Sequence, residues 1–235
     1  MDTRTQARIF LADQRGCTET PGGTSCHTLN FGTYTAEGRE PFGPLCRFSD
    51  ETLRAGAGLE AKSGVNTEVV LLPVTGGLEY RDDQTAGFLE SGQIGVFSLP
   101  AGRSYTVTNP YETETVQFLQ LWFAHGSSGF EPGFSAVRFD LSQKNTLLLL
   151  FERPGDAPVR VLLGRFDGRR EGSYLAAAGA QGTGVFLFVL QGVFEAANRL
   201  LHEKDGLGLW FDRDEVIEFE ALSNDALVLL VEVPR

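Results

Sequence analysis

The sequence has 235 residues and a formal net charge of −11, from 31 acidic and 20 basic side chains. So acidic a chain repels a phosphate backbone, which excludes nucleic acid as an expected partner. The longest apolar segments, 147–151 and 185–194, are shorter than the roughly 20 residues that cross a bilayer, so no membrane partner is expected. The length allows one large β domain or two small ones, each with its own hydrophobic core.

The start of the chain and its cysteines predict a cytoplasmic protein. Residues 1–13 lack the long apolar run behind a basic stretch that marks a signal peptide. Cys17, Cys26 and Cys46 are an odd number of cysteines in a chain without an export signal. We therefore expect all three to be free thiols in a reducing compartment.

The expected elements, in chain order, are almost all β-strands. They are short runs rich in β-branched and aromatic residues, each bounded by glycine, proline or an Asp/Asn turn. These strands span 68–74, 77–81, 94–99, 104–109, 115–123, 146–152, 159–166, 185–190, 193–196, 207–211, 216–220 and 226–233. No stretch of a dozen residues has sustained helical periodicity, and 112–114 and 199–204 are at most short turns. Residues 124–133 are rich in glycine and serine, which predicts a linker between an N-terminal domain, 1–123, and a C-terminal domain, 134–235.

One strand–turn–strand unit occurs twice in the sequence. Gly76 and Gly192 follow similar apolar runs at an offset of 116 residues, and Gly95 and Gly208 repeat at an offset of 113. A repeat of apolar strand and glycine turn indicates a duplicated β unit. The short strands and the duplication together predict an all-β fold of two jelly-roll sandwiches, or barrels, packed together.

Several segments resemble, in the same order, the motifs of one known family. The segments are Cys26-His27-Thr28-Leu29-Asn30-Phe31, Pro41-Phe42-Gly43-Pro44-Leu45, 53–59, 68–82, Phe118-Leu119-Gln120-Leu121-Trp122 and 226–231. They are similar to motifs of the pirin family, the bicupins that include bacterial quercetin dioxygenase-like proteins. The resemblance implies two cupin-type barrels in one chain.

The resemblance also implies a metal site that this sequence alters. Pirins bind a metal, usually iron, in the N-terminal cupin through a His-x-His pair, a later histidine and a glutamate, ligands that suit iron. The matching positions here are Lys62, Gly64, Val107 and Asn109. Glycine and valine have no donor atom, and a lysine must lose its proton before it binds metal. We therefore expect no metal ligands, no cofactor and no catalytic residue of the family type.

The interior of such a barrel would keep polar side chains near the former metal position. The candidate pocket residues are Lys62, Glu68, Tyr105, Thr106, Val107, Thr108 and Asn109. In one alternative, a buried Lys62–Glu68 pair replaces the charge of the iron. In the other, Lys62 turns to solvent and Glu68 bonds to backbone amides. His27 is expected to be a hydrogen-bonded core or interface residue.

Three functions remain open from the sequence. The one favoured by the altered ligand positions is a non-enzymatic pirin-like bicupin that binds a small ligand in its N-terminal barrel. The alternative is a quercetinase-like dioxygenase with a non-standard metal site. A third is a structural or regulatory protein that acts on a protein partner through its surface.

Overall fold

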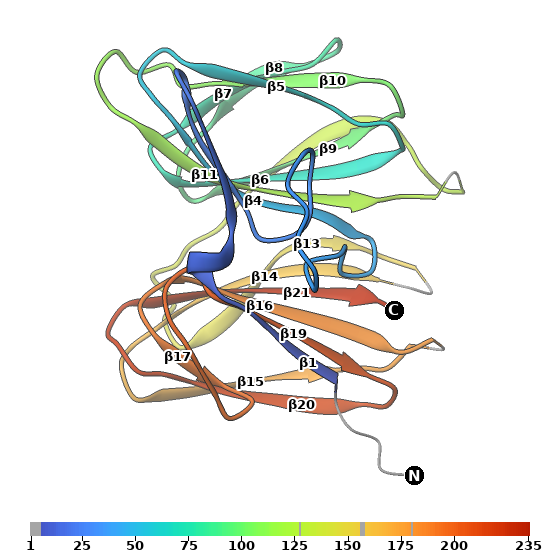
Figure 1. The fold of residues 1–235 in the computed structure, drawn as a ribbon, viewed down its shortest axis with the longest axis vertical. Coiled ribbons are helices and arrows are strands. Elements are labelled where there is room, and N and C mark those ends of the chain that lie inside the picture. The colour runs from blue at the N-terminus through green and yellow to red at the C-terminus, as the bar shows by residue number, and fades with distance from the viewer. Residues whose placement is uncertain (1–5, 127, 156–157, 180) are drawn as a thin grey trace. The chain divides into compact units, whose positions relative to one another are not determined.

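The computed structural model describes residues 6–126, 128–155, 158–179 and 181–235, and the regular secondary structure of these residues is almost entirely β-strand (Figure 1). The one helical segment among them is a 3₁₀ turn, η1 (Ala12–Gln14). The predicted all-β fold is confirmed. No helix in the described ranges is long and apolar enough to span a membrane.

The chain forms two compact units, each built of two facing sheets. One unit, which we call the N-terminal barrel, comprises Gly16–Phe139. The other, the C-terminal barrel, joins the N-terminal segment up to Arg15 with Asp140–Arg235.

The N-terminal barrel has a seven-stranded and a four-stranded sheet. The strands of the larger sheet are β2 (Gly16–Thr20), β3 (Gly23–His27), β4 (Leu45–Leu53), β6 (Thr67–Thr75), β9 (Gln93–Leu99), β11 (Val116–Ala124) and β12 (Gly133–Arg138). Those of the smaller sheet are β5 (Gly58–Lys62), β7 (Leu78–Arg81), β8 (Ala86–Leu89) and β10 (Ser104–Thr108). Their orders are β12-β9-β6-β11-β4-β3-β2 and β5-β10-β7-β8.

The C-terminal barrel has a six-stranded and a four-stranded sheet. The larger sheet contains β1 (Gln6–Phe10), β13 (Thr146–Arg153), β14 (Val159–Phe166), β16 (Thr183–Gln191), β19 (Gly206–Phe211) and β21 (Ala226–Pro234). The smaller contains β15 (Arg170–Ala176), β17 (Phe194–Ala196), β18 (Arg199–Leu201) and β20 (Glu215–Ala221). Their orders are β1-β19-β16-β21-β14-β13 and β15-β20-β17-β18.

The predicted duplication is visible in the topology. Each strand from β3 to β11 has its counterpart ten labels later, and the counterparts follow the same order in their sheets. Gly76 and Gly192 end the equivalent strands β6 and β16 with positive φ angles of 75° and 83°, which glycine adopts without a steric penalty.

Inward-facing side chains fill the space between the sheets of each barrel. In the N-terminal barrel the core includes Val69, Phe97, Val107 and Phe118. In the C-terminal barrel equivalent positions are filled by a separate cluster, which includes Val185, Leu187, Leu209, Ile217, Phe219 and Leu230. Because side chains alternate between the faces of a strand, the same alternation decides which polar groups face the interior.

The limits of the two units differ from those expected. The range 124–133, expected as a linker, includes the first residue of β12, and this strand pairs with β9 in the N-terminal barrel. At the other end, β1 pairs with β19 and so belongs to the C-terminal barrel. Both are edge strands held by backbone pairing, which composition does not reveal. A third difference is β18, which lies within 199–204, where only a turn was expected.

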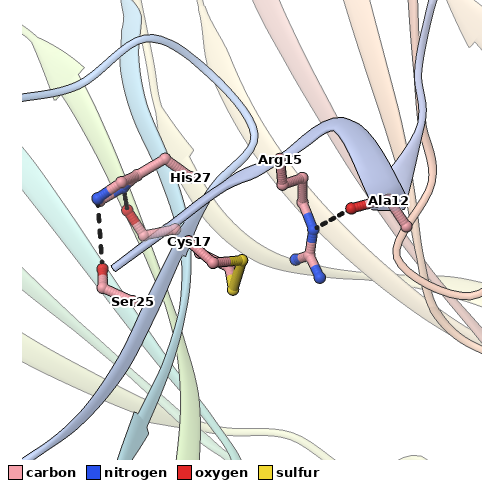
Figure 2. Close-up of a disulfide and its surroundings, with 7 residues drawn as sticks. Ala12, Arg15, Cys17, Ser25 and His27 are labelled. Atoms are coloured by element: carbon pink, nitrogen blue, oxygen red, sulfur yellow. Dashed lines mark hydrogen bonds between the residues drawn. A yellow bond between two sulfur atoms is a disulfide. The ribbon is translucent and has the colours of Figure 1, made fainter. Parts of the chain in front are cut away.

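Two of the three cysteines form a disulfide. Cys17 and Cys26 occupy directly paired positions on β2 and β3 and are joined through their sulfur atoms (Figure 2). The prediction that all three thiols are free was therefore wrong for this pair, because antiparallel pairing brings together cysteines nine residues apart in the sequence. Cys46 is free.

Candidate functional site

The N-terminal barrel contains a cleft of about 520 Å³, which is within the usual size range of small-molecule sites. Its walls come from the β2–β3 hairpin, from β4, from the edge strand β5 and from the loop at 31–34, and Trp122 of β11 also lines it. Phe31, Tyr34 and Trp122 supply aromatic surface, and His27, Arg47 and Glu51 supply polar groups.

The polar groups reach this cleft because the inner face of β4 is polar. Arg47, Ser49 and Glu51 alternate with Phe48 and Asp50 along the strand, and all three are buried. Strand pairing then sets their neighbours: Ser49 lies opposite His27 on β3 and opposite Gln120 on β11. A polar patch therefore extends across three adjacent strands of the larger sheet.

Five polar side chains form a chain of hydrogen bonds from Glu51 through Arg47, Ser49 and His27 to Ser25, which we call the Arg47–Glu51 ring. Arg47 donates from Nε to Ser49 Oγ over 2.8 Å and from Nη2 to Glu51 Oε1 over 2.7 Å. Ser49 Oγ lies 2.8 Å from His27 Nδ1, and Ser25 Oγ lies 3.4 Å from His27 Nε2 (Figure 2 shows this last contact). The Ser25 hydroxyl lies near the Glu51 carboxylate and lowers the pKa of that group, so the two ends of this chain of hydrogen bonds lie close together.

The donor and acceptor roles in the ring follow from Arg47, whose guanidinium can only donate. Because Ser49 Oγ accepts from Arg47, its hydroxyl proton is free to be donated to His27 Nδ1. The imidazole then carries its proton on Nε2 and donates it to Ser25 Oγ. In this arrangement both nitrogens of a neutral histidine have a partner.

Burial controls the charges in the ring. Desolvation, helped by the positive charge of Arg47, lowers the pKa of His27 to about 4, so the imidazole is neutral at pH 7. Burial raises the pKa of Glu51, and the neighbouring Arg47 opposes that rise. The Arg47–Glu51 ion pair is itself buried, with side chains only 7% and 3% exposed.

Arg47 also packs against the aromatic wall of the cleft. Its guanidinium carbon lies 4.2 Å from the ring centroid of Phe31 and 5.0 Å from that of Trp122. These cation–π contacts hold the guanidinium plane in place. Within the described residues, its third nitrogen, Nη1, has no hydrogen-bond acceptor.

A second hydrogen-bonded group fills the barrel next to the cleft. Tyr105 donates from its hydroxyl to Gln120 Oε1 over 2.5 Å, and Trp122 donates from Nε1 to Tyr105 Oη over 3.2 Å. Complete burial raises the pKa of Tyr105, so its hydroxyl remains protonated. Gln120 Nε2 is buried and has no partner among the described residues.

The structure disperses most of the pocket residues expected from the sequence. Lys62 is exposed on β5 and lines the rim of the cleft. Glu68 is buried on β6, in the opposite sheet. Lys62 makes no ion pair with any described residue, so the expected Lys62–Glu68 pair is not formed. The exposure of Lys62 agrees with that part of the second alternative.

The expected residues on β10 also have separate places. Tyr105 and Val107 face the core, whereas Thr106 and Thr108 alternate with them and are half-buried. Asn109 is buried and structural: its Nδ2 donates to the carbonyls of Leu53 and Glu114, and its Oδ1 accepts the Tyr111 amide.

The side chains at the positions matched to the pirin metal ligands do not fit an iron centre. Lys62 is exposed, Gly64 and Val107 have no donor atom, and the amide of Asn109 is fully used by backbone partners. In the part of the chain that the structure describes, no three His, Cys, Asp or Glu side chains are grouped so that they could hold a metal ion.

The ring residues Arg47, Ser49, Glu51 and Ser25 were missed in the sequence analysis. Their signal was the alternation Arg47-Phe48-Ser49-Asp50-Glu51, which has polar residues at every position of one face. That alternation is hard to interpret from sequence, because it looks like the exposed face of a surface strand. His27, by contrast, is the hydrogen-bonded core residue that was expected.

The C-terminal barrel has a hollow of about 660 Å³ that is less suited to a ligand. Glu171, Glu220 and Glu195 lie opposite one another across β15, β20 and β17 and line it. None of the three is buried, so water solvates their charges. The N-terminal cleft, with its buried and pre-arranged polar groups, is the stronger candidate.

Comparisons with known proteins support the fold. No protein-family model matches the chain. PA1210 of Pseudomonas aeruginosa, described as a proposed quercetin 2,3-dioxygenase, is 24% identical over 214 residues, which cover 88% of this chain and 90% of that protein.

Solved structures resemble the chain along almost its whole length. YhhW from Escherichia coli superposes with a TM-score of 0.84 at 20% identity, over 97% of this chain and 98% of that one. A second YhhW structure, described as a bacterial pirin in complex with nickel(II), superposes with a TM-score of 0.78 at 19% identity, over 97% of this chain and 99% of that one. A quercetin 2,3-dioxygenase from Acinetobacter baumannii gives 0.74 at 14% identity, over 97% and 85%. The predicted similarity to pirins is confirmed, and the fold is that of a bicupin.

Proposed function

We propose that this chain is a pirin-like bicupin that binds a small organic ligand in the cleft of its N-terminal barrel, without an iron centre and without dioxygenase activity. The observation that carries the proposal is a contrast between the residues at the matched metal-ligand positions and the residues of the cleft. The positions matched to metal ligands hold Lys62, Gly64, Val107 and Asn109, while the same barrel has a pre-arranged polar and aromatic cleft that Lys62 lines.

The cleft has the composition expected of a binding site. Small-molecule sites are mostly apolar hollows with a few polar groups that fix the orientation of the ligand. Here Phe31, Tyr34 and Trp122 supply the apolar surface, and the Arg47–Glu51 ring supplies rigid polar groups. Because Arg47, Ser49, Glu51 and His27 are hydrogen-bonded to one another, their side chains are ordered before a ligand arrives, which reduces the entropic cost of binding.

Ligand binding can be followed through the two tryptophans of the chain. Trp122 lines the cleft and its indole N–H is hydrogen-bonded, whereas Trp210 lies in the C-terminal barrel. A fragment library is added to ¹⁵N-labelled protein, and the two indole cross-peaks are recorded. We expect fragments that shift the Trp122 peak in a saturable way and leave the Trp210 peak in place.

A pair of phenylalanine variants locates the binding. Phe31→Ala removes cleft wall and should weaken binding of those fragments, whereas Phe88→Ala, an exposed phenylalanine outside the cleft, should not. If no fragment shifts the Trp122 peak, or if both variants bind as the parent does, the cleft is not a ligand site. A protein that acts through its surface would give that result.

The dioxygenase alternative is supported by the names of the similar proteins from Pseudomonas and Acinetobacter. It is tested by metal content after exposure to Fe(II), Mn(II), Co(II), Ni(II), Cu(II) and Zn(II), followed by oxygen consumption with quercetin. Under the proposal, less than about a tenth of an equivalent of metal binds, because competent sites with such ligands saturate readily. Near-stoichiometric metal together with oxygen uptake would replace the proposal with the alternative.

A further inference from the structure

We propose that the cleft selects an aromatic monocarboxylate, and that Arg47 Nη1 binds one of its carboxylate oxygens. This inference rests on the proposed function, because it names the class of ligand for the same cleft. Four features support it: the unused Nη1 donor of the guanidinium, the charge balance around it, the aromatic wall, and the size of the cleft.

The first feature is the way in which Arg47 is used. Its Nε and Nη2 are committed to Ser49 and Glu51, so the guanidinium cannot turn without breaking both hydrogen bonds. The fully enclosed side-chain atoms without a partner in the described ranges are Thr28 Oγ1 and Gln120 Nε2. Arg47 Nη1 is not one of them, although it has no protein acceptor. Nη1 therefore faces the cleft that Arg47 lines, where it is a donor in a fixed position, available to an acceptor on a ligand.

The second feature is the charge around the site. A guanidinium binds carboxylate oxygens through charge-assisted hydrogen bonds, which are stronger than neutral ones. The charge of Arg47 is already partly balanced by buried Glu51, which would repel a dianion such as a phosphate monoester. The other charged side chains that line the cleft, Glu60 and Lys62, are exposed and of opposite sign. His27 is neutral at pH 7. The four charges that line the cleft sum to zero, so an anion at Nη1 meets no excess of negative charge, and a monoanion is repelled less by Glu51 than a dianion is.

The third and fourth features concern the body of the ligand. Phe31 and Trp122 stand edge to face with their centroids 5.4 Å apart, and both contact the Arg47 guanidinium. A carboxylate bound at Nη1 therefore lies beside aromatic surface, against which a planar ring packs favourably. The cleft volume of about 520 Å³ has room for a ligand of one or two rings.

The test compares three probes that differ in one property each. 2-Naphthoate has both the aromatic rings and the charge, 2-naphthamide has the rings without the charge, and decahydro-2-naphthoate has the charge and the two rings without their aromaticity. Affinities come from the shift of the Trp122 indole peak and from calorimetry. We expect 2-naphthoate to bind at least about tenfold more tightly than either of the others, as the loss of one charge-assisted hydrogen bond implies.

The variants must avoid leaving a lone charge buried, because that would unfold the barrel. The double variant Arg47→Met with Glu51→Gln removes both charges together, and Arg47→Lys keeps the charge but loses the planar fork. Arg138→Met, an exposed arginine on β12, is the matched control. We expect the double variant to bind naphthoate and naphthamide equally, Arg47→Lys to show a reduced preference, and Arg138→Met to behave as the parent.

The outcomes separate this inference from the function on which it rests. If naphthamide binds as tightly as naphthoate, or if the double variant keeps the preference, the role of Arg47 is wrong while the cleft remains a ligand site. If neither these probes nor any library fragment shifts the Trp122 peak, the proposed function itself fails. Circular dichroism of each variant confirms that the comparison is made between folded proteins.

Discussion

At the scale of single residues, His27 shows how a buried network fixes a charge state. Its Nδ1 accepts the Ser49 hydroxyl proton, so a second proton on the imidazole would face a donor instead of an acceptor. Burial and the charge of Arg47 both disfavour the imidazolium, which places the pKa of His27 at about 4 instead of its usual 6.5. The ring is therefore stable only while this histidine is neutral.

A pH dependence of stability follows. Between pH 6.5 and about 4, unfolded chains bind a proton at His27 and folded ones do not, so the free energy of unfolding should fall as the pH falls. One proton accounts for at most about 1.4 kcal/mol per pH unit, and above pH 6.5 the contribution is constant. Urea unfolding of the parent and of His27→Gln between pH 4.5 and 7.5 checks this. Parallel stability curves for the two proteins would contradict it.

Tyr105 should contribute a measurable but modest stability through its hydroxyl. In Tyr105→Phe the hydrogen bond to Gln120 is lost, whereas Trp122 Nε1 keeps Gln120 Oε1 as an acceptor at 3.3 Å. We expect a loss of about 1–2 kcal/mol in the free energy of unfolding by urea. Tyr80→Phe is the control, because the Tyr80 hydroxyl has no hydrogen-bond partner in the described part of the chain. Equal effects of both substitutions would rule out the Tyr105–Gln120 bond as the cause.

The residues of the candidate site were only partly accessible from the sequence. Lys62 was expected near the site and lines its rim, and His27 was expected to be a hydrogen-bonded core residue. Arg47 and Glu51 could not be found, because burial of an ion pair depends on which face of β4 turns inward. That choice is made by pairing with β3 and β11, and neither register can be read from the residues of β4 alone.

At the scale of elements, the β2–β3 hairpin forms a wall of the cleft and ends the larger sheet of the N-terminal barrel. An edge hairpin has neighbours on one side only, so it is the part of a sheet that opens most readily. The Cys17–Cys26 disulfide joins its two strands beside Ser25 and His27 (Figure 2). It thereby restrains two members of the Arg47–Glu51 ring.

Loss of this disulfide should weaken the hairpin. Closing a loop of about ten residues stabilises a protein by roughly 2–3 kcal/mol in the chain-entropy model. We therefore expect Cys17→Ser with Cys26→Ser, or treatment with a reductant, to lower the free energy of unfolding by up to about that amount. Hydrogen exchange should also quicken in residues 16–27.

Two controls accompany that measurement. Cys46→Ser removes the free thiol and leaves the disulfide in place, so the reductant should still destabilise this variant. Mass spectrometry of the unreduced parent after alkylation should find one modified cysteine. Three modified cysteines would show that the thiols of Cys17 and Cys26 are free in solution.

Three of the strands that were missed differ in their surroundings from the most apolar strands that were predicted. β6, β11, β16 and β21 lie in sheet interiors, and their apolar runs identify them in the sequence. The strands β1, β2 and β12 lie at sheet edges, and most of their residues are exposed. They are held by backbone pairing with a neighbour, which leaves little trace in residue type.

At the scale of the whole molecule, the chain crosses between its two compact units twice. The segment that begins with β1 belongs to the C-terminal barrel, and its backbone is tied there by Asp205, which accepts the Ala12 amide over 2.8 Å. Phe10 is buried on this strand, with its ring 5.1 Å from that of Phe186. The N-terminal strand therefore covers an edge of a sheet whose other strands come from the end of the chain.

Loosening β1 should be felt far away in the sequence. Phe10→Ala removes a buried ring and should cost about 3 kcal/mol or more in the stability of the C-terminal barrel. Amides of β19 that pair with β1 should then exchange faster, whereas those of the equivalent strand β9 should not. Ile9→Ala changes an exposed side chain of the same strand and should have little effect. Unchanged protection of β19 in Phe10→Ala would show that β1 is dispensable.

The positions of β1 and β12 have a consequence for the origin of the molecule. β1 precedes the first set of repeated strands and completes the second, while β12 precedes the second set and completes the first. The first strand of each half thus pairs in the larger sheet of the other half, which is the reciprocal exchange found in strand-swapped homodimers. Gene fusion of such a dimer would produce this connectivity directly. If the chain were cut between residues 124 and 133, each half would have an unpaired first strand and an open sheet edge. We would then expect the two halves to complete their sheets only by associating with each other.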